Sequence, residues 1–250
     1  MSSTPVALVT GGSRGIGAAC CRLLADRGYA LVVNYAGNEA AAQAVMRGIV
    51  DSGGMAVAVQ GDVAVEADVL RMFAAVDALG TLGALVNNAG VVDLPARVDE
   101  MSVERLSRMM SINIIGSFLP SREAIRRMST KHGGKGGAIV NLSSAAATLG
   151  SPGQYVDYAA SKGAIDSFTI GLAREVAAEG IRVNAVRPGI IDTDIHASGG
   201  WPDRVAQVRD SLPMKREGTA LEVAQAITWL LSDEASYVTG AILNVSGGRG

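Results

Sequence analysis

The chain has 250 residues, of which 48% are hydrophobic, so it is long enough to bury a large core. Its formal net charge of −2, its lack of a basic block and its 4% aromatic residues argue against nucleic acid as a partner. No segment has the roughly 18 consecutive apolar residues that cross a bilayer, and the first residues lack a signal-peptide pattern. We therefore expect a cytoplasmic protein with no membrane partner.

Cysteine and histidine are scarce. The only ones are Cys20, Cys21, His132 and His196, and the two cysteines are adjacent. A zinc site needs three or four ligands in one place, and a disulfide framework needs spaced cysteines. We therefore expect neither a metal site nor disulfide bonds.

Short apolar runs alternate with longer stretches of helical spacing along the chain. The runs predict strands at 6–10, 30–35, 56–60, 84–86, 138–142, 182–186 and 241–245. The stretches predict helices at 15–27, 38–51, 66–79, 103–128, 158–179 and 220–231. Strands that are apolar throughout are buried on both faces, as in parallel sheets. The sequence therefore predicts an α/β fold: a single doubly wound domain over 1–250, with a seven-stranded parallel sheet and helices on both faces.

A long connection over residues 190–218 interrupts this alternation. Connections of this length are often binding loops, so we expect a substrate lid here. His196 lies in it, and a solvated or packing role is favoured over a substrate contact. Trp201 is equally compatible with a cover over the substrate mouth and with an interface anchor.

A glycine-rich turn follows the first predicted strand and leads directly into a helix. Residues 10–17 read Thr-Gly-Gly-Ser-Arg-Gly-Ile-Gly. Glycines let the backbone approach a pyrophosphate closely, and the helix N-terminus offers free N–H groups to it. In this strand–turn–helix context the motif predicts a dinucleotide-binding site. The residues expected to contact the cofactor here are Gly11, Ser13, Arg14, Gly15, Ile16 and Gly17.

The end of the second predicted strand indicates which dinucleotide is preferred. Sites for NAD usually carry an acidic side chain there for the ribose 2′-hydroxyl. This chain reads Val-Asn-Tyr-Ala-Gly-Asn over 33–38 and has no acid before Glu39. A 2′-phosphate would not be repelled, and the forked cation of Arg14 suits it. We therefore expect NADP(H) in preference to NAD(H), which stays possible, with Asn34 and Tyr35 among the cofactor contacts.

Two further strand ends carry candidate cofactor contacts. Asp62 and Val63 follow the third predicted strand, and residues 87–90, Asn-Asn-Ala-Gly, follow the fourth. Ligands of open α/β sheets lie beyond the carboxyl ends of the strands. Asp62 and Val63 are placed to meet the adenine ring, although Asp62 is equally compatible with a helix N-cap.

Tyr158 and Lys162 share one face of a predicted helix because they are four residues apart. A phenol is a usable acid at neutral pH, and a nearby ammonium favours its ionised form, so the pair suits general acid–base chemistry. Alone, this spacing is more often a buried tyrosine beside a lysine stem. Its position after a dinucleotide motif and a fifth strand favours the catalytic interpretation.

In order and spacing these segments resemble the short-chain dehydrogenase/reductase family, in its standard-length subgroup, over nearly the whole chain. The resemblance implies a Rossmann fold and hydride transfer between a nicotinamide and a carbon–oxygen centre. The matching segments are 10–17, 62–63, 87–90, Asn113, 143–144, 158–162 and 187–189 with Thr193.

The resemblance also implies roles for four side chains. Tyr158 would exchange a proton with the substrate oxygen, and Lys162 would lower the pKa of Tyr158 and bind the nicotinamide ribose. Ser144 would hold the substrate oxygen, and Asn113 would distort its helix locally and anchor a water in a proton relay. The cofactor contacts implied besides Tyr158 and Lys162 are Asn87, Ala89, Gly90, Pro188, Gly189, Ile191 and Thr193.

One spacing departs from the family pattern. The serine there usually lies thirteen residues before the tyrosine, which is Ala145 in this chain, so the loop before Tyr158 is one residue longer than usual. Ser143 and Ser144 directly follow the predicted strand; Ser144 is preferred and Ser143 is the alternative. Tyr155 is not a competing candidate, because no lysine lies four residues beyond it.

We therefore expect an NADP(H)-dependent oxidoreductase that acts on a sugar, a ketone or a 3-oxoacyl compound, similar to ketoacyl reductases and glucose 1-dehydrogenases. The alternative is a dinucleotide-binding redox sensor or scaffold without catalysis, but such proteins typically lose the tyrosine or the lysine. The resemblance further implies a homotetramer, or else a homodimer, built partly from the helices that carry Asn113 and Tyr158.

Overall fold

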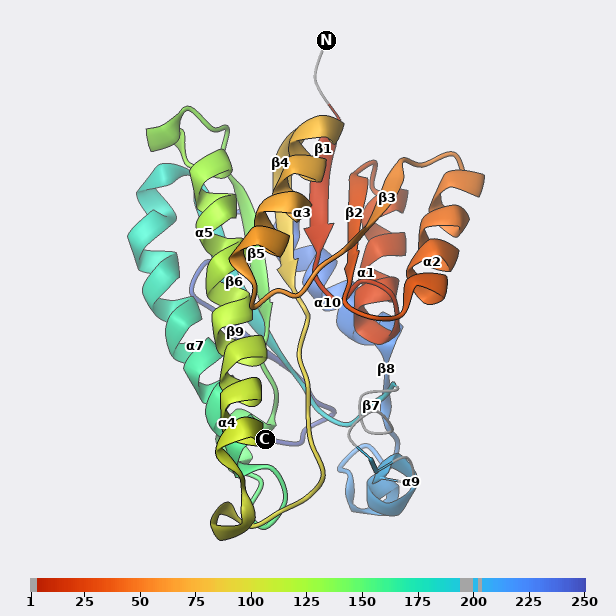
Figure 1. The fold of residues 1–250 in the computed structure, drawn as a ribbon, viewed down its shortest axis with the longest axis vertical. Coiled ribbons are helices and arrows are strands. Elements are labelled where there is room, and N and C mark those ends of the chain that lie inside the picture. The colour runs from red at the N-terminus through yellow and green to blue at the C-terminus, as the bar shows by residue number, and fades with distance from the viewer. Residues whose placement is uncertain (1–3, 194–199, 202–203) are drawn as a thin grey trace.

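A seven-stranded parallel sheet forms the centre of the protein in the computed structural model, which describes residues 4–193, 200–201 and 204–250 (Figure 1). The strand order is β3-β2-β1-β4-β5-β6-β9, and every neighbouring pair is parallel. The predicted sheet is thereby confirmed. The strands are β1 (Pro5–Val9), β2 (Ala30–Tyr35), β3 (Ala56–Gln60), β4 (Thr81–Asn87), β5 (Gly137–Leu142), β6 (Ile181–Pro188) and β9 (Ile242–Val245).

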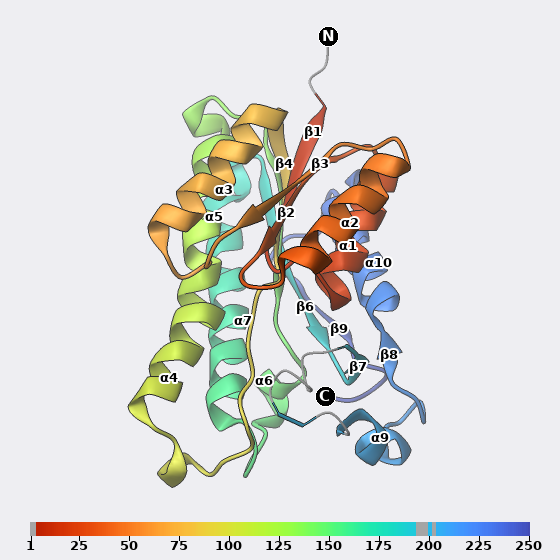
Figure 2. The same ribbon diagram turned by 45° about the vertical axis from the view of Figure 1, so that its right-hand side comes forward.

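Helices cover both faces of the sheet, as predicted (Figure 2). One layer consists of α1 (Gly15–Asp26), α2 (Glu39–Asp51) and α10 (Ala220–Leu231). The other contains α3 (Glu66–Leu79), α4 (Val103–Met110), α5 (Gly116–Met128) and α7 (Val156–Val176).

Strand β1 shows why successive residues of the predicted strands are all apolar. Ala7 and Val9 pack into the core under α1 and α10, whereas Val6 and Leu8 pack into the core under α3 and α5. All four are completely buried. Because successive side chains of a strand point to opposite faces, both sets must be apolar when helices cover both faces.

The chain direction sets the position of the site. From β1 the chain first builds β2 and β3 on one side, then crosses to β4 on the other side of β1. Open α/β sheets bind ligands at such a reversal, outside the carboxyl ends of the strands. The glycine-rich turn follows β1 and residues 88–90 follow β4, so the two segments meet at this point.

Three local features add to the predicted elements, and the first is the helix distortion that the family resemblance implied at Asn113. The stretch 103–128 is interrupted by a π-helical turn, Ser111–Ile115, between α4 and α5. A short helix α6 (Ala146–Leu149) follows β5. Within the connection 190–218, β7 (Ile191–Asp192) pairs with β8 (Gly218–Thr219), and α9 (Arg204–Val208) lies between them; His196 falls outside the described residues.

Among the helices that the structure describes, none combines the length and apolar character of a membrane span. The described part of the chain also contains no group of three or more His, Cys, Asp or Glu side chains arranged to hold a metal ion.

Candidate active site

A cleft of about 410 Å³ runs along the carboxyl ends of the central strands, from the glycine-rich turn to α7. Most residues that the sequence singled out contribute to its wall. These are Gly11, Ser13, Arg14, Gly15, Ile16, Asn34, Tyr35, Asp62, Val63, Ala89, Gly90, Ser144, Tyr158, Lys162, Pro188, Gly189, Ile191 and Thr193.

The glycine-rich turn places bare backbone at one end of the cleft. Gly11 and Gly15 have φ angles of +61° and +52°, which favour glycine. No side chain caps the start of α1, so its first N–H groups stay available to an anion. Gly17 does not line the cleft; a Cβ there would lie 2.3 Å from the Gly11 carbonyl oxygen, so this glycine lets α1 pack against the turn.

Two asparagine amides hold the turn in place. Asn34 is buried, and its Oδ1 accepts from the Gly11 N–H at 3.1 Å while its Nδ2 donates to the Gly61 carbonyl at 3.0 Å. Asn88 Nδ2 donates to the carbonyls of Thr10 and Gly11, both at 2.9 Å. The Asn34 amide is thus hydrogen-bonded to backbone groups. Beside it, Tyr35 and residues 36–38 line the cleft at the end of β2.

The structure corrects the expected position of Asn87. This residue does not line the cleft; it is buried between β4, β5 and α5, where Nδ2 donates to Ser121 Oγ at 2.9 Å and to Asn141 Oδ1 at 2.8 Å. Asn88, the next residue, lies on the cleft wall instead. Successive side chains point to opposite sides at a strand end, and the paired asparagines gave no sequence signal for which one faces the ligand.

Where the cleft reaches the end of β3, Asp62 is exposed and Val63 is buried. Asp62 Oδ1 accepts from the Ala64 N–H at 2.8 Å, which shapes the turn after β3. Asp62 is not the N-cap of α3, because that position is Val65.

Asn113 sits in the π-helical turn, so the predicted distortion of its helix is present. Its side-chain amide forms two hydrogen bonds with the Val91 backbone: Oδ1 accepts from the Val91 N–H at 2.8 Å, and Nδ2 donates to the Val91 carbonyl at 3.0 Å. Nδ2 also donates to Ser161 Oγ at 3.1 Å. Asn113 therefore ties the loop after β4 to α7, although its side chain lies behind the cleft wall.

Tyr158 and Ser144 both line the part of the cleft that lies away from the glycine-rich turn. Burial raises the pKa of the Tyr158 phenol, while the hydrogen bond with Ser144 and the charge of Arg204 oppose that rise. Ser143 instead is buried and donates to the Lys162 carbonyl at 3.3 Å. Of the two candidate serines, Ser144 is the one beside the phenol.

Lys162 is 4% exposed and donates from Nζ to the Leu142 carbonyl at 2.6 Å. Burial lowers the pKa of Lys162 to about 8, against the opposing effect of Asp166. Its ammonium lies 5.6 Å from the centre of the Tyr158 ring. Ser144 and Arg204 lower the Tyr158 pKa against the effect of burial.

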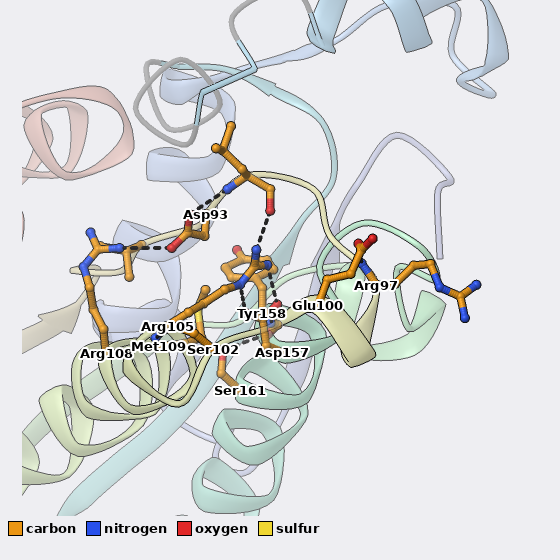
Figure 3. A network of polar contacts seen from close by, with 12 residues as sticks. Asp93, Arg97, Glu100, Ser102, Arg105, Arg108, Met109, Asp157, Tyr158 and Ser161 are labelled. Carbon is orange, nitrogen blue, oxygen red and sulfur yellow. Dashed lines mark hydrogen bonds and ion pairs between the residues drawn. The ribbon is translucent and has the colours of Figure 1, made fainter.

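A buried ion pair supports the start of α7 (Figure 3). Arg105 donates from Nε and from a terminal nitrogen to the two carboxylate oxygens of Asp157, at 2.8 and 3.2 Å. Asp157 directly precedes Tyr158 and accepts from its N–H at 2.9 Å. Arg105 also donates to the Leu94 carbonyl at 2.6 Å, so the loop after β4 is held by the same side chain.

Sequence reasoning missed Arg204 and Arg249, which both line the cleft. Arg204 lies in α9, 46 residues after Tyr158, and only folding brings the two together. Arg204 is one of four cations in the expected substrate lid, with Arg209, Lys215 and Arg216, so no sequence signal singled it out.

A parallel sheet with a glycine-rich turn at its switch point, and a tyrosine, a serine and a lysine at the far end of the same cleft, defines a dinucleotide-binding oxidoreductase. Residues 11–249 match the family model described as "Enoyl-(Acyl carrier protein) reductase". The chain belongs to the short-chain dehydrogenase/reductase family, whose members act on CH–OH and C=O groups.

Relatives and solved structures agree with this assignment. The chain is 57% identical over 245 residues to "Uncharacterized oxidoreductase YgfF" of Escherichia coli, covering 98% of this chain and 99% of that protein. A 3-ketoacyl-(acyl-carrier-protein) reductase from Brucella melitensis complexed with NADH has a TM-score of 0.90, 33% identity and 98% coverage of both chains. A short-chain dehydrogenase from Burkholderia cenocepacia in complex with NADP has a TM-score of 0.90, 34% identity, and coverage of 98% of this chain and 97% of that chain.

Proposed function

We propose that this enzyme transfers a hydride between NADP(H) and the carbonyl or alcohol carbon of a small substrate, with Tyr158 as the general acid and base. The observation that carries the proposal is that Tyr158, Ser144 and Lys162 line the same cleft as the glycine-rich turn. When bound, the nicotinamide supplies the hydride for reduction and accepts it for oxidation. The substrates in view are ketones, sugars and 3-oxoacyl compounds.

The residues present fit a dinucleotide. Gly15 faces Thr193, and a Cβ on Gly15 would lie 3.2 Å from the Thr193 side chain, so the two form a narrow passage beside the start of α1. At Gly189 a Cβ would lie 2.7 Å from the Ser246 carbonyl oxygen. Bare backbone at these positions lets the chain segments that border the cleft pack closely against each other. The glycine-rich turn and the free N–H groups at the start of α1 would hold the diphosphate. The nicotinamide end would be bordered by Pro188, Gly189, Ile191 and Thr193.

In reduction, Ser144 orients the substrate oxygen and Tyr158 donates the proton that this oxygen needs. The raised pKa of Tyr158 keeps the phenol protonated at neutral pH, which suits a general acid. In the opposite direction the phenolate accepts the alcohol proton. Lys162 lines the cleft, and its Nζ would lie 3.6 Å from a Cβ on Gly90; its proposed role is to bind the nicotinamide ribose. Asn113 holds this part of the wall, and its proposed role is to anchor a water of the proton relay.

A preference for NADP(H) follows from the charge at the end of β2. Tyr35 and residues 36–38 line the cleft there without a carboxylate, and Arg14 lines it from the glycine-rich turn. A 2′-phosphate meets a cation and no repelling charge. NAD(H) lacks that phosphate and gains nothing from Arg14.

We also propose a homotetramer, or else a homodimer, that uses the outer faces of α5 and α7. Phe118 is 47% exposed and stacks on Phe168 with ring centroids 3.9 Å apart. Ile115, the last residue of the π-helical turn before α5, and Ile170 of α7 are also exposed. Size-exclusion chromatography with light scattering tests this, and a clean monomer would overturn it.

The experiment that tests the cofactor is a fluorescence titration of the protein with NADPH and, in parallel, with NADH. We expect the wild type to bind NADPH more than tenfold tighter than NADH, a difference of roughly 1.4 kcal/mol. This preference should disappear in Arg14→Gln. Arg22→Gln is the matched control, because Arg22 lies on the same helix but does not line the cleft. Binding of neither cofactor would overturn the enzyme proposal, and tight binding with no reduction of any carbonyl would favour a redox sensor.

A further inference from the structure

Arg204 is a buried cation at the substrate end of the cleft. Its side chain lines the same cleft as Tyr158, and the residue is only 8% exposed. Its positive charge acts on the Tyr158 phenol. A guanidinium that lines the same cleft as the proposed proton donor borders the space that a substrate would occupy.

Aromatic rings hold the guanidinium in a fixed place. Its carbon lies 4.7 Å from the centre of the Tyr155 ring and 5.5 Å from the centre of the Trp201 ring. A terminal nitrogen donates to Gln154 Oε1 at 3.3 Å. Tyr155 is itself 2% exposed, so the support is rigid. A preorganised arginine loses little side-chain entropy when it binds a ligand.

The loop before Tyr158 supplies two of these three supports. Gln154 and Tyr155 belong to the loop that is one residue longer than the family pattern, and the Gln154 carbonyl accepts from the Ala96 N–H at 3.0 Å. The longer loop therefore contains the residues that contact the Arg204 guanidinium, and its extra residue does not change the position of Ser144 directly after β5.

A further arginine of the cleft wall acts on Arg204. Arg249, next to the C-terminal residue, lines the cleft and its like charge adds to burial in lowering the pKa of Arg204. Two cations in a partly enclosed cleft repel each other, and an anion between them relieves that repulsion. The remaining wall near Tyr158 includes apolar side chains of Val92, Leu149 and Ile190.

We propose that Arg204 binds a carboxylate of the substrate, so that the enzyme prefers oxo acids and hydroxy acids over neutral ketones and alcohols. Arg249 contributes to the same positive potential. A planar forked guanidinium matches a planar carboxylate in two-point geometry. The proposal deepens the proposed function and rests on it, because it assigns part of the substrate for the same cleft.

The test compares acids with their own methyl esters as substrates for NADPH-dependent reduction. The pairs are 2-oxobutanoate, 4-oxopentanoate and 4-formylbenzoate with the respective esters, which vary the separation between charge and carbonyl. For at least one pair, the wild-type ratio of kcat/KM for acid over ester should exceed tenfold. In Arg204→Met this ratio should fall at least tenfold, and in Arg204→Lys by less.

The ratio distinguishes recognition from structural support. Loosening of the segment around Tyr155 and Trp201 would slow acid and ester together and leave the ratio unchanged, and that result would overturn the proposal. Arg209→Met is the matched control: Arg209 is close in sequence, but its exposed side chain pairs with Glu217 at 2.6 Å and lies outside the cleft wall. Its ratio should equal that of the wild type.

A binding measurement separates this proposal from the proposed function. Benzoate and methyl benzoate are titrated calorimetrically into the protein with and without NADPH. Benzoate binding at least tenfold tighter than ester binding, and lost in Arg204→Met, supports the carboxylate site even if no carbonyl is reduced. Normal NADPH binding and ester reduction without any benzoate preference would overturn the carboxylate site and leave the proposed function standing.

Discussion

Arg105 forms a two-point ion pair with Asp157, the residue that directly precedes Tyr158 (Figure 3). The Asp157 side chain is completely buried and that of Arg105 is 11% exposed. A buried carboxylate is tolerated only when it is paired and hydrogen-bonded. This pair therefore fixes the start of α7, and with it the direction of the Tyr158 side chain.

Removing the arginine should be strongly destabilising. Arg105→Met leaves the Asp157 carboxylate buried without its cation, which costs about 3–5 kcal/mol. Urea denaturation measures the change in the free energy of unfolding. Arg97→Met is the control, because Arg97 pairs with Asp99 on the surface, where such pairs contribute about 0.2–1 kcal/mol. Equal losses in the two variants would contradict the role given to the buried pair.

Sequence patterns could predict the sheet, the glycine-rich turn and the tyrosine–lysine spacing because each is a local signal. The Arg105–Asp157 pair spans 52 residues, and no local pattern links its members. Asn34 and Asn87 show a related limit. Both lie at strand ends where a ligand contact was expected, yet each amide is engaged within the protein. Residue type indicates polarity at a strand end, whereas side-chain direction depends on tertiary packing.

Tyr158→Phe should remove turnover while NADPH binding is retained. The variant keeps the ring and loses only the proton that the substrate oxygen needs, so kcat should fall roughly 100- to 10,000-fold. Stopped-flow or steady-state absorbance of NADPH gives kcat, and fluorescence titration gives the cofactor Kd. Tyr155→Phe is the matched control, since Tyr155 carries a buried phenol in the same cleft. If Tyr155→Phe lost its turnover while Tyr158→Phe stayed active, Tyr155 and not Tyr158 would be the proton donor.

Gly17→Ala should weaken cofactor binding through packing rather than contact. The added Cβ would lie 2.3 Å from the Gly11 carbonyl oxygen and 2.6 Å from Asn88 Nδ2, so α1 or the turn must shift. We expect at least a tenfold increase in the NADPH Kd and a lower free energy of unfolding. Gly48→Ala is the control: Gly48 is exposed within α2 with no atom within 4 Å of the added Cβ, and alanine there should stabilise the helix by about 1 kcal/mol. Unchanged NADPH binding in Gly17→Ala would show that close packing of α1 against the glycine-rich turn is not needed for cofactor binding.

Lys162 should make stability rise with pH in the alkaline range. Burial lowers the pKa of Lys162 in the folded protein to about 8 from 10.5. Between these values the unfolded chain keeps the proton that the folded protein has lost, so the unfolded state binds more protons and stability increases with pH. The increase is at most about 3 kcal/mol, since each pKa unit corresponds to about 1.4 kcal/mol.

Lys162→Met isolates this contribution. Cys20, Cys21 and Tyr158 have raised pKa values, so they make stability fall with pH, but they do so in both proteins. The difference in the free energy of unfolding between wild type and variant, measured in urea at pH 7, 8, 9 and 10, should therefore shift toward the wild type as the pH rises. A difference independent of pH would mean that the hydrogen bond from Nζ to the Leu142 carbonyl holds the ammonium charged throughout this range.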